Sequence, residues 1–466
     1  MSQSAPETAQ ATTDPFSSLT DFLALPRLGG LALSADGTRL ATSVQTLDPE
    51  KKKWQSAIWE IDPSGERPAR RLTRSAPGES APAWLPDGSL LFTSARPVPG
   101  AKEDGDPKPA LWNLPTGGGE ARPAVTRPAG VAGFTVAADS GDVVLAAATM
   151  PGAADAEADE ERRKQRKDAG VTALLHEAYP VRYWDHDLGP AAPHLFWVGQ
   201  LPPDDATGEA ADPVPLRDLT PGARPPHGAG EDFRISPDGR MVARAEDIAD
   251  GLAGRRSRVV LTDTATGETR VLVDDPLADV YAPAFSPDNA TLVCVREALS
   301  TYAEPPDYTL LLVNLPDGAA HDLTPEFDRW PSAPQFSADG EAVYFLADDD
   351  GRHAILRVPV AGGAPVRLTA DGAYSDLQVA RDGSALYALR SAVDSPRCRS
   401  GWTRPPRCSS PRRCRAPAPW VPFPGRCTRS RPPRPTGAAC SRGWCCRRAR
   451  PPSRPLPCCC GSTAVR

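Results

Sequence analysis

One four-residue turn, repeated seven times, constrains the fold of this chain more than any other feature. In the copy Ser236-Pro237-Asp238-Gly239, proline presets φ for the second turn position, aspartate bonds nearby backbone, and glycine adopts the left-handed conformation that closes the turn. Apolar and polar residues alternate from Phe233 to Ala243 on both sides of it, which predicts a β-hairpin. The other copies are Ser34-Ala35-Asp36-Gly37, Leu85-Pro86-Asp87-Gly88, Ala138-Asp139-Ser140-Gly141, Ser286-Pro287-Asp288-Asn289, Ser337-Ala338-Asp339-Gly340 and Ala380-Arg381-Asp382-Gly383.

The spacing of these turns predicts the architecture. From Asp36 onward the steps between copies are 51, 52, 99, 50, 51 and 43 residues. A period of about 40–50 residues with several strands in each repeat is typical of β-propeller blades. Two further strands recur between turns, one like 57–61 and one that ends in a Leu-Thr pair. A β-sandwich would not need an equal period, so we predict an all-β, seven-bladed propeller over residues 31–394.

We expect the seventh blade to be incomplete. Its turn is at Asp382 and its second strand at 385–389, and the pattern then stops, so that the two outer strands are missing from the readable sequence.

The N-terminal arm, residues 1–30, is expected to be disordered over 1–13 and to form a short helix over 16–25, where apolar residues follow helical spacing. Residues 1–14 are small and polar, without the apolar run of a signal peptide or membrane span. We therefore expect a cytoplasmic protein with no membrane partner.

Charge and cysteine divide the chain near Ser395. The formal net charge of −6 combines −23 over residues 1–394 with +17 over residues 395–466, and ten of the 11 cysteines lie in the second part. Arg, Pro and Cys make up 42 of those last 72 residues, too few apolar residues remain for a core, and we expect a disordered tail.

If the tail is a genuine protein segment, it could be an Arg-rich nucleic-acid-binding or metal-binding segment. It lacks Lys and any base-reading motif, and it has neither His nor a Cys-x-x-Cys pair. A disulfide scaffold needs an oxidising compartment, and the lack of a recognisable signal peptide argues against one. We expect no nucleic-acid partner, no metal and no cofactor.

The 99-residue step contains an insertion at about 151–193. Residues 154–167 are acidic first and basic last, which suits a solvated helix. The segment that follows holds Arg182, Trp184, Asp185 and His186, the densest group of candidate substrate or gate contacts. Such a group could bind a charged peptide end; alternatively, the aromatic residues anchor the insertion and the charges pair with each other. A metal site is disfavoured because His186 has no second His at a matching offset.

No catalytic residue can be assigned. The chain contains no Gly-x-Ser-x-Gly elbow, no phosphate-binding loop and no dinucleotide fingerprint, and no spacing of Ser, His and Asp indicates a triad.

The repeated turns, the Leu-Thr strand ends and the segment from Tyr179 to Asp187 resemble the N-terminal propeller of prolyl oligopeptidase-family serine peptidases, on the acylaminoacyl-peptidase and dipeptidyl-peptidase side. The resemblance covers roughly residues 14–394. It implies a propeller that caps an α/β-hydrolase domain, admits short peptides and leaves the catalytic triad to that domain. This chain departs from the pattern because no such domain is readable after the propeller, so we expect the chain to be inactive.

Two interpretations of the propeller remain. The first is a substrate-gating propeller whose catalytic half is missing; the second is a stand-alone scaffold that binds protein or peptide. The broken seventh blade favours the first.

The composition of the tail suggests a frameshift. If the codons of Cys458-Cys459-Cys460 and of the residues after them have been read one base late, shifting the frame back by one base permits Leu-Leu-Leu-Trp-Ile-His-Gly-Gly-Pro in the genetic code. That string resembles the buried strand and His-Gly-Gly loop that lead to the oxyanion hole of an α/β-hydrolase. We therefore expect residues from about 396 onward to be an out-of-frame reading of a peptidase gene.

Overall fold

The computed structural model describes residues 18–99, 107–176, 179–201, 215–224, 229–251, 254–392 and 395–403. In this part of the chain strands predominate, and helices are found at two places, α1 (Leu19–Ala24) and α2 (Ala156–Asp168). The helix α1 lies within the predicted 16–25, and α2 confirms the predicted helix of the insertion. The expected disorder of 1–13 and most of the predicted tail lie outside the described residues.

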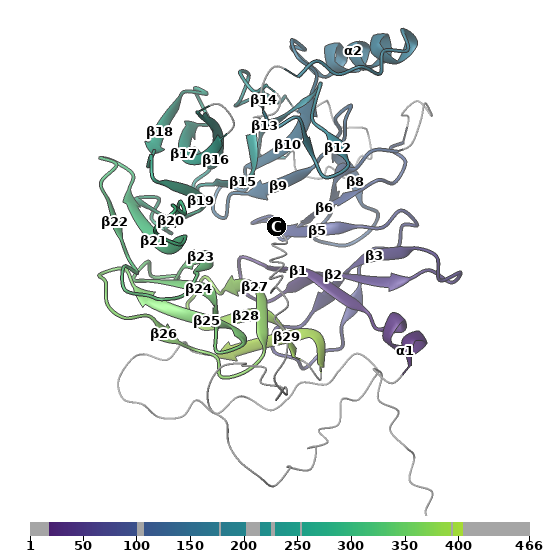
Figure 1. The fold of residues 1–466 in the computed structure, drawn as a ribbon. Helices are drawn as coiled ribbons and strands as arrows, with labels where there is room; N and C mark the ends of the chain where they lie inside the picture. Colours follow the sequence, from purple (N-terminus) through teal and green to yellow (C-terminus); the bar gives the residue numbers. More distant parts are fainter. Residues whose placement is uncertain are drawn as a thin grey trace, which may run out of the picture. The chain divides into compact units, whose positions relative to one another are not determined.

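Five four-stranded antiparallel sheets follow one another along the chain (Figure 1). The first three are β1 (Arg27–Leu33), β2 (Leu40–Leu47), β3 (Trp54–Ile61) and β4 (Arg70–Arg71); β5 (Ser80–Trp84), β6 (Leu90–Ser94), β7 (Ala110–Leu114) and β8 (Arg122–Val125); and β9 (Gly133–Val136), β10 (Val143–Thr149), β13 (Ala192–Gly199) and β14 (Arg217–Asp218). The next two are β15 (Ala229–Ile235), β16 (Met241–Asp250), β17 (Gly254–Asp263) and β18 (Thr269–Val273); and β19 (Ala278–Phe285), β20 (Thr291–Ala298), β21 (Asp307–Asn314) and β22 (Ala320–Asp322).

A sixth, seven-stranded sheet corrects the predicted number of blades. It joins β23 (Ser332–Phe336), β24 (Ala342–Asp349), β25 (Arg352–Pro359) and β26 (Val366–Arg367) to β27 (Ala373–Val379), β28 (Ala385–Ala392) and β29 (Ser395–Thr403). The link is one parallel pair, His353 with Ala373. The described residues thus form a propeller of six sheets, and the prediction of seven separate blades is wrong because this pair merges the last two repeats.

The expected loss of both outer strands from the last repeat is also wrong. Strand β29 pairs antiparallel with β28 from Ala385↔Thr403 to Ala392↔Ser395, within the segment predicted to be disordered. An exposed strand edge offers unpaired backbone N–H and C=O groups to whatever segment follows, so pairing there does not need an apolar pattern.

All seven predicted turns join the first and second strands of a repeat, and they share one end of the fold, the turn end. In four copies the serine hydroxyl donates to the turn aspartate, as Ser236 does to Asp238 at 2.6 Å, and it also accepts from the backbone where the second strand begins. Gly239 has φ of 79°, and a Cβ there would overlap with the Asp142 carboxylate of the neighbouring turn. These residues therefore fix both the hairpin and the packing of one turn on the next.

The Leu-Thr pairs end the outer strands. In each of the four predicted pairs the threonine hydroxyl accepts a hydrogen bond from a backbone N–H of the third strand, and the leucine N–H donates to the carbonyl of that same residue. For Thr324 the donor is the N–H of Leu310, at 2.9 Å. A hydroxyl thus completes the sheet where the short fourth strand ends.

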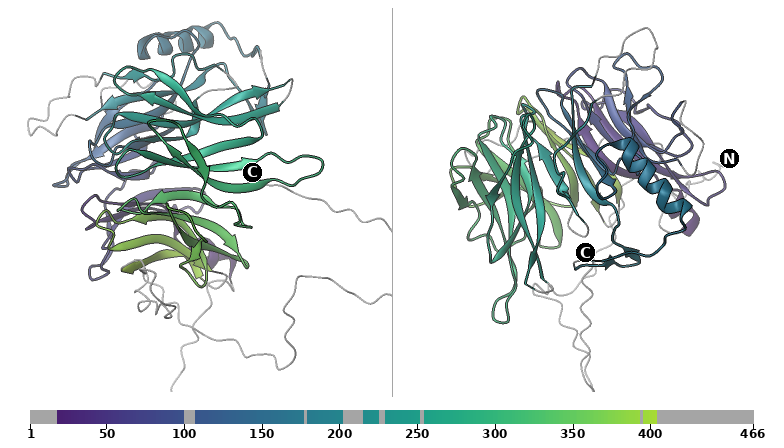
Figure 2. Two further views of the ribbon diagram at one scale, coloured as in Figure 1. Left: turned by 90° about the vertical axis from the view of Figure 1, so that its left-hand side faces the viewer. Right: turned by 90° about the horizontal axis from the view of Figure 1, so that it is seen from above.

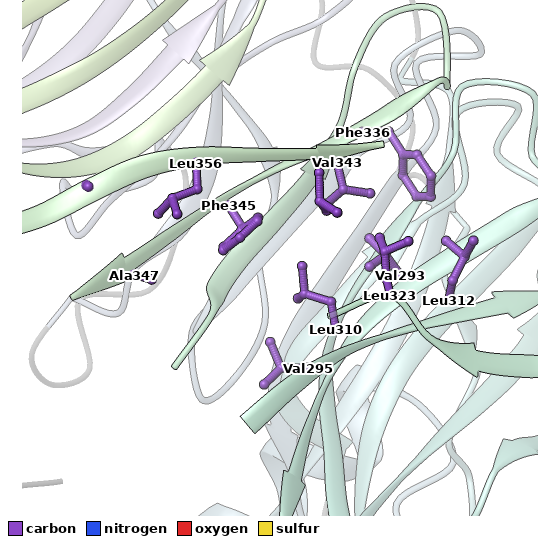
Figure 3. Packing of buried hydrophobic residues seen from close by; sticks show 12 residues of the cluster. Val293, Val295, Leu310, Leu312, Leu323, Phe336, Val343, Phe345, Ala347 and Leu356 are labelled. Atoms are coloured by element: carbon purple, nitrogen blue, oxygen red, sulfur yellow. The ribbon is translucent and has the colours of Figure 1, made fainter. Parts of the chain in front are cut away.

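The core lies between neighbouring repeats. Seven buried clusters each combine residues of two successive repeats, and the seventh brings Leu31, Leu40 and Ile61 of the first sheet against Leu389 of β28. Figure 3 shows the largest, in which Leu310 of β21 and Phe345 of β24 are fully buried. The second strands are buried on both faces, as Leu90–Ser94 is, because they have a neighbouring sheet on each side. Cys294, in β20, is buried there as a small apolar residue.

Candidate functional site

The insertion between β10 and β13 holds the predicted candidate residues, and α2 anchors its first half. The side chain of Asp155 accepts from the N–H of Ala158 at 2.7 Å and caps the helix. Asp159, fully buried, accepts from the N–H of Met150 at 2.8 Å and from Arg163 Nε at 3.1 Å. Arg163 in turn donates to the carbonyl of Ala148. One face of α2 is therefore held to the end of β10 by a buried carboxylate.

The second half of the insertion is a two-stranded ribbon of β11 (Arg182–Tyr183) and β12 (His186–Asp187), apart from the six sheets (Figure 2). The structure brings the four candidate residues together in this hairpin. Arg182 Nε lies 3.0 Å from Asp187 Oδ1, and His186 Nδ1 lies 2.6 Å from Asp185 Oδ1. Trp184 is in the turn, with φ of 50°, and 87% of it is exposed. The polar side chains of the hairpin thus form two local pairs, and the indole of Trp184 faces solvent.

The same segment exposes several other large apolar side chains. Val171, Leu175, Tyr179 and Val181 are all exposed, in addition to Trp184. Folded chains seldom leave so many apolar groups in water within so short a stretch unless the surface contacts something. The insertion belongs to the connection between second and third strands, so it lies at the end of the fold opposite the turn end. We call this the loop end; α1, which precedes the first inner strand, is there too.

A buried polar group beneath the insertion was missed by the sequence reasoning. His194 Nδ1 lies 2.7 Å from Asp218 Oδ2, and 5% of His194 is exposed. The Arg127 guanidinium lies 4.1 Å from the centre of the Phe196 ring, and burial lowers its pKa. Among the described residues, no hydrogen bond joins His194 to a serine or a cysteine.

Two hollows on the surface do not place a histidine beside a nucleophile either. One of about 380 Å³ lies beside Asp87 and includes Asn113, and one of about 260 Å³ lies between Arg329 and Arg367. Neither is lined by a histidine or a cysteine. Within the described ranges, no three His, Cys, Asp or Glu side chains come together as metal ligands. Neither of the two described helices is long and apolar enough to cross a membrane.

Sequence comparison identifies the proteins that this chain resembles. It is 24% identical over 407 residues to dipeptidyl-peptidase 5 of Porphyromonas gingivalis, which covers 84% of this chain and 55% of the relative. The chain resembles dipeptidyl-peptidase 5. A probable dipeptidyl-peptidase 5 of Aspergillus niger is 27% identical over 243 residues, 47% of this chain and 33% of the relative. The chain thus spans between a third and about half of the length of these relatives. No family model matches the chain.

Solved structures agree on the fold. The acylaminoacyl peptidase of Pyrococcus horikoshii matches 82% of this chain and 52% of its own length, with a TM-score of 0.55 and 12% identity. The β-propeller domain of the Trilobed protease from Pyrococcus furiosus matches 81% of this chain and 93% of its own length, with a TM-score of 0.53 and 10% identity. The similarity to dipeptidyl-peptidase 5 therefore falls on a propeller.

Proposed function

We propose that this chain is the propeller part of a serine peptidase of the prolyl oligopeptidase family, and that it admits short peptides to an α/β-hydrolase domain. The observation that carries the proposal is the similarity to dipeptidyl-peptidase 5 over 84% of the chain, which covers only 55% of the relative. The described residues supply a ring of packed sheets, without a nucleophile placed beside the buried His194. The catalytic groups then belong to the part of the relatives that this chain does not match.

We propose the loop end as the side that meets the hydrolase domain and its peptide. Trp184 offers a large apolar surface there, and Arg182, Asp185 and His186 place charges of both signs beside it. An exposed indole next to ionic groups suits contact with a peptide end or with the rim of a partner domain. Arg182 also pairs with Asp187 across the hairpin, at 3.0 Å.

The first experiment compares two proteins. One is the 466-residue chain, and the other continues residues 1–395 in the frame that restores a hydrolase. We expect the extended protein to hydrolyse dipeptidyl anilides, with its activity titrated by a serine-directed phosphonate, and the 466-residue chain to show background rates. Hydrolysis by the purified 466-residue chain, titrated by the same phosphonate, would refute the proposal.

The second experiment tests the loop end in the extended protein. We expect Trp184→Ala to raise KM or lower kcat for peptide substrates, while Val271→Ala, at an exposed apolar side chain of the outer strand β18, serves as the control. Equal KM and kcat for Trp184→Ala and the unchanged protein would show that the ribbon does not contribute to the site. The alternative function, a stand-alone scaffold that binds protein or peptide, predicts that the restored frame contains no hydrolase.

A further inference from the structure

Neighbouring turns contact each other around the turn end. Arg39 Nη1 donates to the carbonyl of Gly88 at 3.1 Å, and the N–H of Asp139 donates to the carbonyl of Pro237 at 2.8 Å. Each contact joins one turn to the next in the ring, as expected for sheets packed side by side.

Arg381 is different because it contacts a turn that is not its neighbour. Its Nη1 donates to the carbonyl of Ala138 at 2.9 Å, and its guanidinium forms an ion pair with Asp139. Arg381 belongs to the turn between β27 and β28, whereas Asp139 belongs to the turn between β9 and β10.

The two turns lie on opposite sides of the ring. The first strand of each repeat is its inner strand. These inner strands contact each other in the order β1, β5, β9, β15, β19, β23, β27 and back to β1. Strand β9 is third and β27 is last, so at least two inner strands separate them in either direction. The Arg381 side chain therefore crosses the axis of the ring, and at its position three other copies of the turn carry proline.

The contact holds the last repeat where the ring closes between β27 and β1. Strands β1 and β27 lie in separate sheets, and among the described residues they are joined by a side-chain hydrogen bond, Leu33 N–H to Gln378 Oε1 at 3.4 Å, and by packing around Leu389. Without a backbone ladder, a contact from the last turn to the opposite side adds a constraint that neighbouring sheets do not supply.

We propose that Arg381 and Asp139 form a cross-axis latch, which restrains the last turn against the opposite turn and so limits opening of the ring between β27 and β1. The two side chains are 48% and 42% exposed. An ion pair that water reaches is weak and is screened by salt. The latch is therefore a reversible restraint that ionic strength or substitution releases, and it stands independently of the peptidase function.

The test is hydrogen exchange, measured by mass spectrometry on the 466-residue chain. We expect Arg381→Gln to accelerate exchange about two- to five-fold, the factor that corresponds to an exposed ion pair. The acceleration should occur both in residues 380–384 and in residues 137–142. Because these windows are far apart in sequence, a merely local role of Arg381 would change only the first.

Three further measurements complete the test. Arg240→Gln removes an arginine from a turn without a cross-axis contact and should leave both windows unchanged. Exchanging the charges, Arg381→Asp with Asp139→Arg, should restore slow exchange. In the unchanged protein, raising NaCl from about 0.05 to about 0.5 M should accelerate both windows together, which tests the latch even if a variant does not fold. Exchange in residues 137–142 that is insensitive to both Arg381→Gln and salt would overturn the proposal.

Discussion

The threonine hydroxyl of the four Leu-Thr pairs gives the sharpest prediction about stability. Thr324 is 2% exposed, and its hydroxyl accepts the N–H of the fully buried Leu310 at 2.9 Å. Thr324→Val keeps the shape of the side chain but leaves that N–H without a partner. A buried donor that loses its acceptor costs about 1–3 kcal/mol, so we expect the free energy of unfolding to fall by about 2 kcal/mol.

Equilibrium unfolding in urea measures this change, with an unchanged slope showing that only stability has moved. Thr46→Val is the matched control, since Thr46 is an exposed threonine on β2, and it should change stability by less than about 0.5 kcal/mol. Thr369→Val, at the equivalent hydrogen bond to Ile355, should repeat the loss. If Thr324→Val were as stable as the control, the Leu-Thr pair would not complete the sheets as described.

Four further outcomes are expected. Hydrogen bonds from serine hydroxyls and from nearby N–H groups lower the pKa of four turn aspartates, Asp36, Asp288, Asp339 and Asp382. The stability that these aspartates contribute is therefore present above their unfolded pKa of about 3.9 and is lost as pH falls through their lower folded pKa values. Acid titration of unfolding should show a drop in stability that is confined to pH below about 4. Phe345→Ala should destabilise the fold by about 3–5 kcal/mol in urea, because the ring is fully buried between two repeats. Asp159→Asn should make α2 the first site of proteolysis, whereas unchanged cleavage would show that the buried carboxylate does not anchor it. Trp184→Ala should leave the unfolding midpoint unchanged, because the side chain packs against little, and a large shift would make the residue structural.

Local features of the fold could be predicted from the sequence because each has its own chemistry. The serine, aspartate and glycine of a turn such as 236–239 form their hydrogen bonds within six residues. The charges of α2 and its capping Asp155 are equally local. The recurring period then indicates that repeats pack on each other, and the clusters between them confirm it.

The remaining features depend on which strands meet. The parallel pair of His353 and Ala373 merges two repeats without any signal in either segment. Strand β29 pairs through its backbone, which a composition of Arg, Pro and Cys does not reveal. His194 and Asp218 meet because β13 and β14 are neighbours, and Arg381 reaches Asp139 because the ring closes. The arginine does carry a signal in sequence, since it replaces proline or alanine in a repeated turn.

The grouping of the ribbon residues could be predicted from the sequence. The sequence placed Arg182, Trp184, Asp185 and His186 together, and the structure shows them on one hairpin.

The nucleotide sequence that encodes residues 395–466 and the region after it tests the central claim most directly. Our account predicts that shifting the reading frame of this region back by one base replaces the Arg, Pro and Cys composition with a hydrolase sequence. That sequence should include the strand and His-Gly-Gly loop permitted by Cys458-Cys459-Cys460 and the residues after it, followed by a Gly-x-Ser-x-Gly elbow. A restored frame interrupted by stop codons, or one without a nucleophile elbow, would contradict it.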